Sequence, residues 1–269
     1  MKYYFILFLI LIFSSELFAW EIRDKRQFGP YSIFIEHDEE WLWHRVTIKK
    51  NHHQIYQLKE VGHYFDIGNE FSDKEKGPYE IKDINKNGIP DLIISENAMG
   101  TVCCHILHII ELGKNIKDTK LEAGNNSIRF IDFDRDGIDE IEFWDNVIVG
   151  VFASTAGSPL GRVVYRYDRT SNNYKIAPKF MHKNLEINWF NKQKKKIAQE
   201  ANEKTPDLSY AFLETLIDLS YSGHFEEALK TIEEFSPRFK KDASEFKKEF
   251  SRVLDSSEFW REFSAIHNK

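Results

Sequence analysis

Two stretches of the chain carry side-chain oxygens at a spacing that suits a calcium ion. Counted from Asp83, the first stretch has them at positions one, three, five and nine, in Asp83, Asn85, Asn87 and Asp91. Counted from Asp132, the second has them at the same positions, in Asp132, Asp134, Asp136 and Glu140. Calcium takes about six to eight oxygen ligands, and alternate residues of a tight loop can turn toward one centre. The sequence therefore predicts one or two Ca²⁺ ions, bound by a first loop (residues 83–91) and a second loop (residues 132–140).

A glycine stands at position six of each loop, Gly88 and Gly137, where the backbone must turn sharply. The residues that follow, Ile89 and Ile138, are predicted to bind the metal through their backbone carbonyl groups. The alternative interpretation is a pair of surface turns without metal, since Asp, Asn and Gly favour turns by themselves.

The two loops differ in charge. Of the side-chain ligands of the first loop only Asp83 and Asp91 are charged, whereas all four side-chain ligands of the second loop are carboxylates. Because charge count tunes calcium affinity, the sequence predicts that the second loop binds calcium more tightly.

The loops do not fit an EF-hand. An EF-hand loop needs a bidentate glutamate at position twelve, where this chain has Ile94 and Phe143. The flanking residues read as strands, and the motif recurs from 83 to 132, a period of 49 residues. With these loops the chain resembles the FG-GAP and VCBS-type repeats of bacterial exported proteins and integrin-like β-propellers, which implies calcium binding at these positions.

The resemblance extends more weakly to three other segments, which are similar to a group of bacterial exported FG-GAP proteins. They are Met99–His105, Leu219–Gly223 and Ser257–Trp260. The β-rich part, at about 150 residues, supplies only about three or four blade-sized units, fewer than an integrin-like closed propeller needs. The resemblance therefore implies propeller-like or sandwich-like antiparallel sheets, and the length of the β-rich part argues against a closed propeller.

The two cysteines of the chain are neighbours, Cys103 and Cys104. Their Cα atoms lie about 3.8 Å apart, which makes a vicinal disulfide strained but possible. The alternative is a pair of thiols packed on a strand. A zinc or copper site with His105 and His108 is disfavoured, because on a strand Cys103 and His105 point one way and Cys104 and His108 the other.

Short runs of β-type residues surround the loops from Tyr31 to about Phe180, at the spacing of an all-β sheet, sandwich or propeller-like arrangement. After Asn184 the apolar residues recur at helical spacing. Helix signals include a predicted start at Thr205-Pro206, an end at Gly223 and a cap at Ser256. The predicted fold is thus mainly β, with antiparallel sheets and a C-terminal helical segment, or α+β overall.

Three regions are predicted along the chain: a signal peptide (1–19), a β-rich calcium-binding domain (20–184) and a helical segment (185–269). The first region has Lys2, an apolar run from Tyr3 to Phe13 and a small residue, Ala19, before the predicted cleavage. The run is too short to span a bilayer, so we expect a periplasmic or secreted protein with no membrane span after cleavage.

Composition and motifs narrow the function further. A formal net charge of -6 gives no reason to expect a nucleic-acid partner. No nucleophile elbow, Walker loop or zinc-protease helix occurs in the sequence. We therefore expect a non-enzymatic protein whose calcium-rigidified loops present a binding surface to a protein or cell-envelope ligand. The alternatives are a cell-envelope hydrolase with structural calcium, or an inhibitor or immunity-type protein directed at a wall-degrading enzyme.

Overall fold

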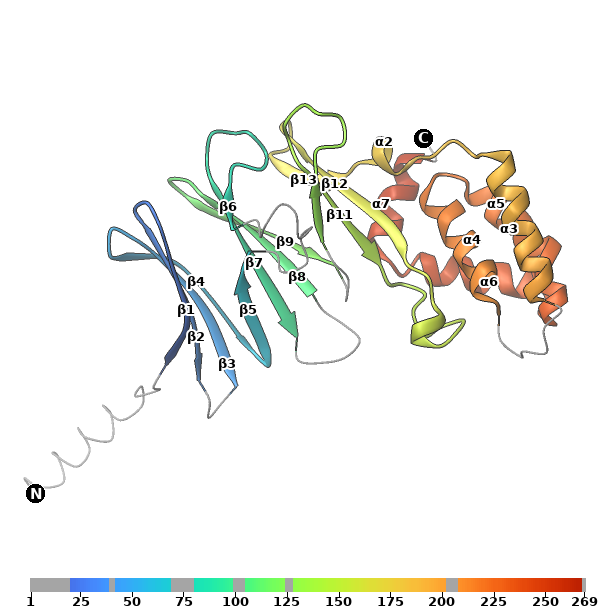
Figure 1. Ribbon diagram of the computed structural model, residues 1–269, viewed down its shortest axis with the longest axis horizontal. Coiled ribbons are helices and arrows are strands. Elements are labelled where there is room, and N and C mark those ends of the chain that lie inside the picture. Colours follow the sequence, from blue (N-terminus) through green and yellow to red (C-terminus); the bar gives the residue numbers. More distant parts are fainter. Residues whose placement is uncertain are drawn as a thin grey trace, which may run out of the picture.

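The computed structural model describes residues 20–38, 42–68, 80–98, 105–123, 128–201 and 208–267. Three antiparallel sheets follow one another along the molecule, and a group of helices adjoins the third sheet (Figure 1). The predicted mixture of antiparallel sheets and C-terminal helices is confirmed. The predicted signal peptide and the pair Cys103 and Cys104 lie outside the described residues.

Each sheet is an up-and-down meander of consecutive strands. The first contains β1 (Glu21–Phe28), β2 (Tyr31–Asp38), β3 (Trp43–Lys50) and β4 (His53–Val61). The second contains β5 (His63–Ile67), β6 (Ile81–Lys82), β7 (Asp91–Ala98), β8 (His105–Leu112) and β9 (Ile116–Glu122). The third contains β10 (Arg129–Ile131), β11 (Glu140–Asp145), β12 (Gly161–Asp168) and β13 (Asn173–Ile176). In the second sheet β5 and β6 share one edge of β7, which gives all three sheets four strand positions.

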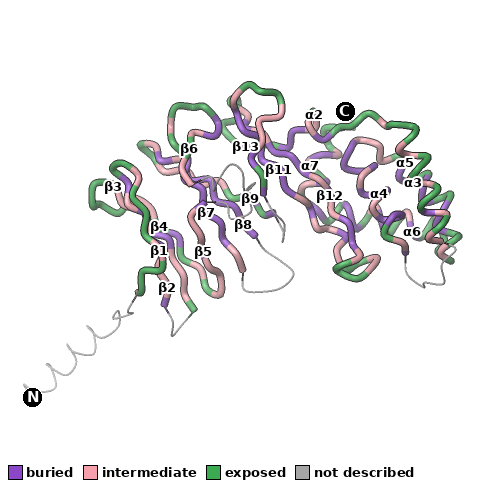
Figure 2. Tube along the Cα trace, viewed as in Figure 1, coloured by how far each residue is buried: buried purple, intermediate pink, exposed green. Residues whose placement is uncertain are grey.

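The middle sheet is buried on both faces, as the tube coloured by burial shows (Figure 2). Along β7, Leu92 and Ile94 belong to a core shared with the first sheet, whereas Ile93 belongs to a core shared with the third sheet. This alternation follows from the two-residue period of a strand. Because both faces are covered, β7 reads as a continuous apolar run in the sequence.

The helices share the core of the third sheet. They are α2 (Pro178–Met181), α3 (Ile187–Glu200), α4 (Tyr210–Tyr221), α5 (Phe225–Phe235), α6 (Ala243–Leu254) and α7 (Glu258–His267), with short 3₁₀ turns at η2 (Thr155–Gly157) and η3 (Ser236–Phe239). A buried carboxylate, Asp145 at the end of β11, accepts hydrogen bonds from Tyr221 of α4 (2.5 Å) and from Ser257 before α7. This network fixes the helices to the sheet.

Helix ends correct one detail of the sequence prediction and confirm another. Helix α4 begins at Tyr210 and is capped by Ser209, whose hydroxyl accepts from Phe212 N. The predicted helix start at Thr205-Pro206 lies outside the described residues. The cap of the last helix is Ser257, which accepts from Trp260 N, and not Ser256. Gly223 has φ +87°, which confirms the predicted left-handed helix end.

No β-type run was predicted for the residues of β1, β5 or β9, and these three strands share one feature. β1 is largely exposed and charged, and β9 has only one buried position, because each forms the edge of its sheet. β5 is a short edge strand of five residues. Edge strands carry little apolar alternation for a pattern to detect.

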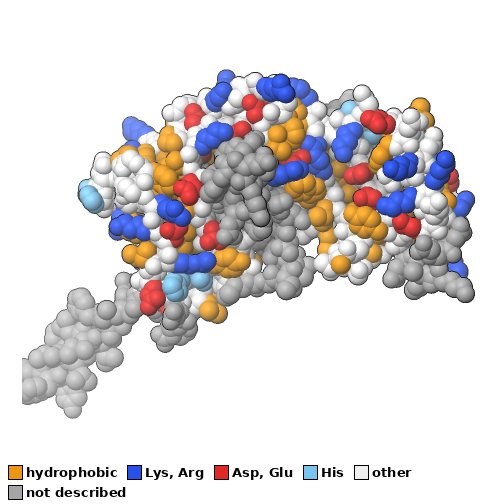
Figure 3. Space-filling view, in the orientation of Figure 1, with side chains coloured by type: hydrophobic (Ala, Val, Ile, Leu, Met, Phe, Trp, Pro, Cys, Tyr) orange, Lys and Arg blue, Asp and Glu red, His pale blue; other side chains and the backbone are white. Residues whose placement is uncertain are grey.

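None of the three described sheets closes on itself, so a propeller ring is not formed by this part of the chain. No described helix is long and apolar enough to cross a membrane. Acidic and basic side chains are interspersed on the face seen in Figure 3, where no single sign of charge dominates.

Candidate functional site

The first loop connects β6 to β7 and is organised around Asp83. Its Oδ1 accepts a hydrogen bond from Asn87 N (3.1 Å) and its Oδ2 accepts from Gly88 N (2.9 Å). Ile89 N donates to the side-chain oxygen of Asn87 (2.8 Å), and Asn87 N also donates to Asn85 (3.0 Å). Side-chain oxygens at positions one, three and five are thus all drawn to the inside of one turn.

The second loop connects β10 to β11 and repeats three of these four bonds. Asp132 Oδ1 accepts from Asp136 N (3.1 Å), and Asp132 Oδ2 accepts from Gly137 N (2.8 Å). Ile138 N donates to Asp136 Oδ1 (2.9 Å). Two different sequences therefore fold into one loop structure at the same place in consecutive sheets.

The backbone conformations match as well. Position four has a positive φ in both loops, 52° at Lys86 and 60° at Arg135, and so does position six, 86° at Gly88 and 84° at Gly137. A β-carbon on Gly88 would meet nothing within 4 Å, so the glycine is required by the left-handed backbone and not by crowding.

A buried carboxylate from position nine lies beneath each loop. Asp91 is 1% exposed, and its Oδ2 accepts from Ile84 N (3.1 Å) while its Oδ1 has no hydrogen-bond partner. Glu140 is fully buried, and its Oε2 accepts from Phe133 N (2.8 Å). Burial, together with the nearby charges of Glu111 and Asp83, raises the pKa of Asp91 to about 7. Burial likewise raises the pKa of Glu140. A bound cation would offset the free-energy cost of keeping these two carboxylates buried and ionised.

The carboxylates of the second loop come close enough to share an ion. Ligand oxygens of Asp132, Asp134 and Asp136 lie within 4.8 Å of one another, and among the described residues this is the one such group of three found. Calcium–oxygen distances of about 2.3–2.6 Å fit that spacing. The backbone carbonyls of Ile89 and Ile138 stay predicted ligands. The two residues occupy equivalent positions, because the backbone N–H of each donates to the side chain two residues before it.

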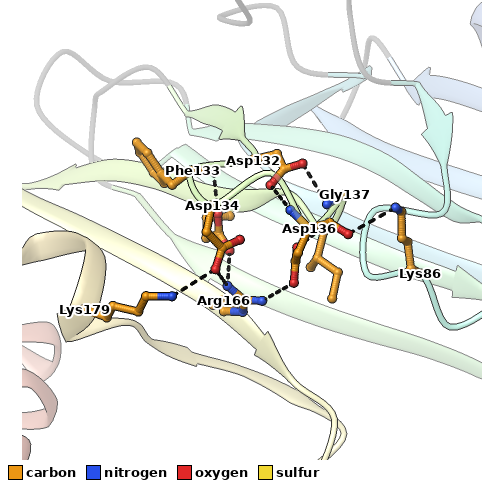
Figure 4. Close-up of polar contacts among 10 residues, drawn as sticks. Lys86, Asp132, Phe133, Asp134, Asp136, Gly137, Arg166 and Lys179 are labelled. Atoms are coloured by element: carbon orange, nitrogen blue, oxygen red, sulfur yellow. Dashed lines mark hydrogen bonds and ion pairs between the residues drawn. The ribbon is translucent and has the colours of Figure 1, made fainter.

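The two loops lie side by side. Asp139 N donates to Ile84 O (3.1 Å), which links the backbones of the loops directly. Lys86 Nζ donates to Asp136 O (3.3 Å) from the first loop, as Figure 4 shows. The two loops are therefore in direct contact.

Charged groups also reach the loops from other strands, and the sequence pattern gave no sign of them. In the second loop, Arg166 of β12 contacts Asp134 (2.7 Å), Asp136 (2.5 Å) and Glu140 (2.9 Å), and Lys179 contacts Asp134 (3.0 Å) (Figure 4). Hydrogen bonds from these two cations hold the pKa of Asp134 below its usual range. In the first loop, Asn87 donates to Glu111 of β8. A count of charges within each loop cannot detect neighbours from other strands.

Beside the second loop lies an open groove of about 800 Å³. Acidic, basic and aromatic groups line it together, among them Asp136, Arg166, Arg169, Lys179 and Phe180. A mixed lining of this kind suits a polar or charged ligand.

A second group of ionisable residues lies between the first two sheets. His108 is fully buried, with Nε2 at 2.6 Å from Glu96 and Nδ1 at 3.0 Å from Asp118. Glu96 also contacts His63 (2.5 Å), and Tyr56 donates to Asp118 (2.7 Å). Both ring nitrogens of His108 face carboxylates, so the charged imidazolium can donate a hydrogen bond to each. We interpret the group as a structural network, because it is buried and not open to a substrate.

The His108 network predicts a pH dependence of stability. Burial alone would lower the pKa of His108, but the hydrogen bonds of Asp118 and Glu96 outweigh it and the pKa is raised above 6.5. A raised pKa in the folded state means that the stabilisation is fully present below about pH 6.5 and is lost as pH rises through the folded pKa. We expect the free energy of unfolding, measured by urea titration, to fall above neutral pH.

A His108→Gln variant serves as the control for that titration. It removes the titrating group, so its unfolding free energy should change less between pH 6 and 9 than that of the wild type. Equal slopes in the two proteins would contradict the assignment of the pH dependence to His108.

Three other histidines gather around Gly223. The ring centroid of His182 lies 5.3 Å from that of His224 and 5.9 Å from that of His267. Unlike the second loop, these residues do not form a group whose ligand atoms all lie within 4.8 Å. They belong to the surface of the helical part and are far in sequence from the loops.

No protein-family model, curated protein or solved structure matches this chain. The resemblance to FG-GAP and VCBS-type repeats therefore stays a prediction that rests on the two loops.

Proposed function

We propose that this protein is an exported, non-enzymatic calcium-binding protein whose metal ions stiffen two adjacent loops and the binding surface beside them. One observation carries the proposal: two loops of different sequence share their hydrogen bonds, their positive φ angles and a buried carboxylate at position nine. A surface turn has no need of a buried carboxylate beneath it.

The chemistry favours calcium over softer metals. The side-chain donors of both loops are carboxylate and amide oxygens, with no imidazole or thiolate among them. Such oxygen sets suit Ca²⁺, which accepts irregular geometry, better than Zn²⁺ or Cu²⁺.

A binding role fits the surroundings of the loops. The open groove beside the second loop is continuous with its carboxylates Asp134 and Asp136 and with the cations Arg166 and Lys179. Stiffening the loop would fix one wall of that groove. A protein segment or an envelope glycan with charged or polar groups is the class of ligand we propose for it.

The proposal predicts that calcium stabilises the fold. A ligand that binds only the folded state at about 100 times its Kd adds about 2.7 kcal/mol to the unfolding free energy. For a domain of this size that corresponds to a rise in Tm of about 5–10 °C. The measurement is a thermal melt of protein lacking residues 1–19, in excess calcium and in chelator, paired with titration calorimetry.

Magnesium at the same concentration is the control for ionic strength and for non-specific divalent binding. Mg²⁺ demands near-octahedral geometry and gives up water reluctantly, so it should raise Tm much less. Identical melts in calcium and in chelator, with no heat of binding, would reduce both loops to metal-free turns.

A further inference from the structure

The two loops face opposite charges from the neighbouring strand. Asp91 of β7 pairs in register with Glu111 of β8. In the third sheet Ile141 pairs with Tyr165, which brings Arg166 opposite Glu140. Glu111 and Arg166 therefore occupy equivalent positions, each opposite the buried carboxylate of its loop.

The next strand in each sheet confirms that Glu111 and Arg166 are equivalent, because each of them pairs with a lysine. Glu111 pairs with Lys117 of β9, and Arg166 pairs with Lys175 of β13. Beside the first loop, three neighbouring strands thus place Asp91, Glu111 and Lys117 in line. Beside the second loop, the equivalent residues are Glu140, Arg166 and Lys175. Only the middle position changes sign.

Arg166 already neutralises much of the second loop. Its guanidinium contacts Asp134, Asp136 and Glu140, three of the four carboxylates that the sequence assigns to the metal. Guanidinium is planar, permanently charged and able to bind several carboxylate oxygens at once. A Ca²⁺ ion entering this loop would compete with the arginine for the carboxylates of Asp134, Asp136 and Glu140.

The first loop has the opposite arrangement. Buried oxygens of Asp91 (Oδ1) and Glu140 (Oε1) both lack a hydrogen-bond partner, but only that of Glu140 lies beside a cation, Arg166, at 2.9 Å. Glu111 adds a third carboxylate to the first loop through its bond from Asn87. Among the described residues, no ion pair shorter than 4 Å is found for Asp83, Asp91 or Glu111. Lys117 is near enough for its charge to act on Asp91, but no cation among the described residues forms an ion pair with this carboxylate.

We propose that Arg166 is a resident cation of the second loop that competes with calcium, so that the first loop is the tighter calcium site and the second fills only when Arg166 is displaced. This inference rests on the calcium binding proposed above. It reverses the ranking expected from the charges within the loops, because Glu111 and Arg166 shift the balance in opposite directions.

A matched pair of variants tests the inference by calcium titration calorimetry. Arg166→Gln removes the resident cation, and we expect the affinity of the weaker site to rise on the order of tenfold or more, since charge count tunes calcium affinity over several orders of magnitude. Glu111→Gln keeps an oxygen acceptor at the equivalent position but removes a charge, and should weaken the tighter site by a similar factor.

Arg166→Lys keeps the charge and serves as the control for folding and for local disturbance. It should leave the weaker site closer to the wild type than Arg166→Gln does. Thermal melts of all variants in chelator verify that each protein is folded before its affinities are compared.

The outcomes separate this inference from the function beneath it. If the wild type binds calcium but Arg166→Gln changes neither the number nor the affinity of its sites, the competition by Arg166 is refuted and calcium binding stands. If Glu111→Gln weakens only the looser site, the ranking is refuted. If neither the wild type nor any variant binds calcium, the proposed function itself is refuted, and this inference with it.

Discussion

Replacing Asp83 with alanine is expected to abolish the tightest calcium binding and with it most of the calcium-induced rise in Tm. Asp83 is the first ligand of the loop that we infer to be the tighter site, and its carboxylate also orders the turn by accepting from Asn87 N and Gly88 N. Titration calorimetry measures the first effect, and melts in calcium and in chelator measure the second.

The chain offers a matched control at Asp132. This residue accepts the same two backbone hydrogen bonds in the second loop, from Asp136 N and Gly137 N. Both alanine variants should therefore lose a similar stability in chelator, about 1 kcal/mol for each hydrogen bond. Only Asp83→Ala should also lose the tight site; if Asp132→Ala loses it instead, the charges within the loops rank the sites correctly and Arg166 has little influence.

Gly161→Ala is expected to destabilise the protein by about 3 kcal/mol, because overpacking a filled core forces neighbours out of place. An added β-carbon would lie 2.5 Å from Tyr221 Cε2. The ring of Tyr221 cannot yield easily, because it is 3% exposed, packs on Trp260 and Phe263, and donates to Asp145. Urea unfolding of the variant and the wild type measures the difference.

Two further variants show whether the contact with Tyr221 is the cause. At Gly113 an added β-carbon would have no neighbour nearer than 3.4 Å, so Gly113→Ala should cost much less. Tyr221→Leu removes the ring atoms that the new methyl group meets, and Gly161→Ala should cost less in that background than in the wild type. Equal costs in both backgrounds would place the strain elsewhere.

The pattern of the chain was sufficient for the broad fold. The apolar runs at Asp91–Ala98 and His105–Leu112 are strands, and the helical spacing after Asn184 corresponds to helices. Buried positions must be apolar, so the pattern of burial along each element appears directly in its sequence. The edge strands β1 and β9 were not predicted, because an exposed edge leaves no such period.

The sequence by itself determined the two loops: the positions of their oxygens, the glycine at position six and the acid at position nine act over nine residues and need no distant partner. What only the tertiary structure decided is which other charges meet those oxygens. Glu111 and Arg166 stand opposite Asp91 and Glu140 through strand pairing, and His108 meets Glu96 and Asp118 across two strand pairs. Electrostatic interactions act through space, so the charge that a metal ion would experience depends on strand register, which no count along the chain contains.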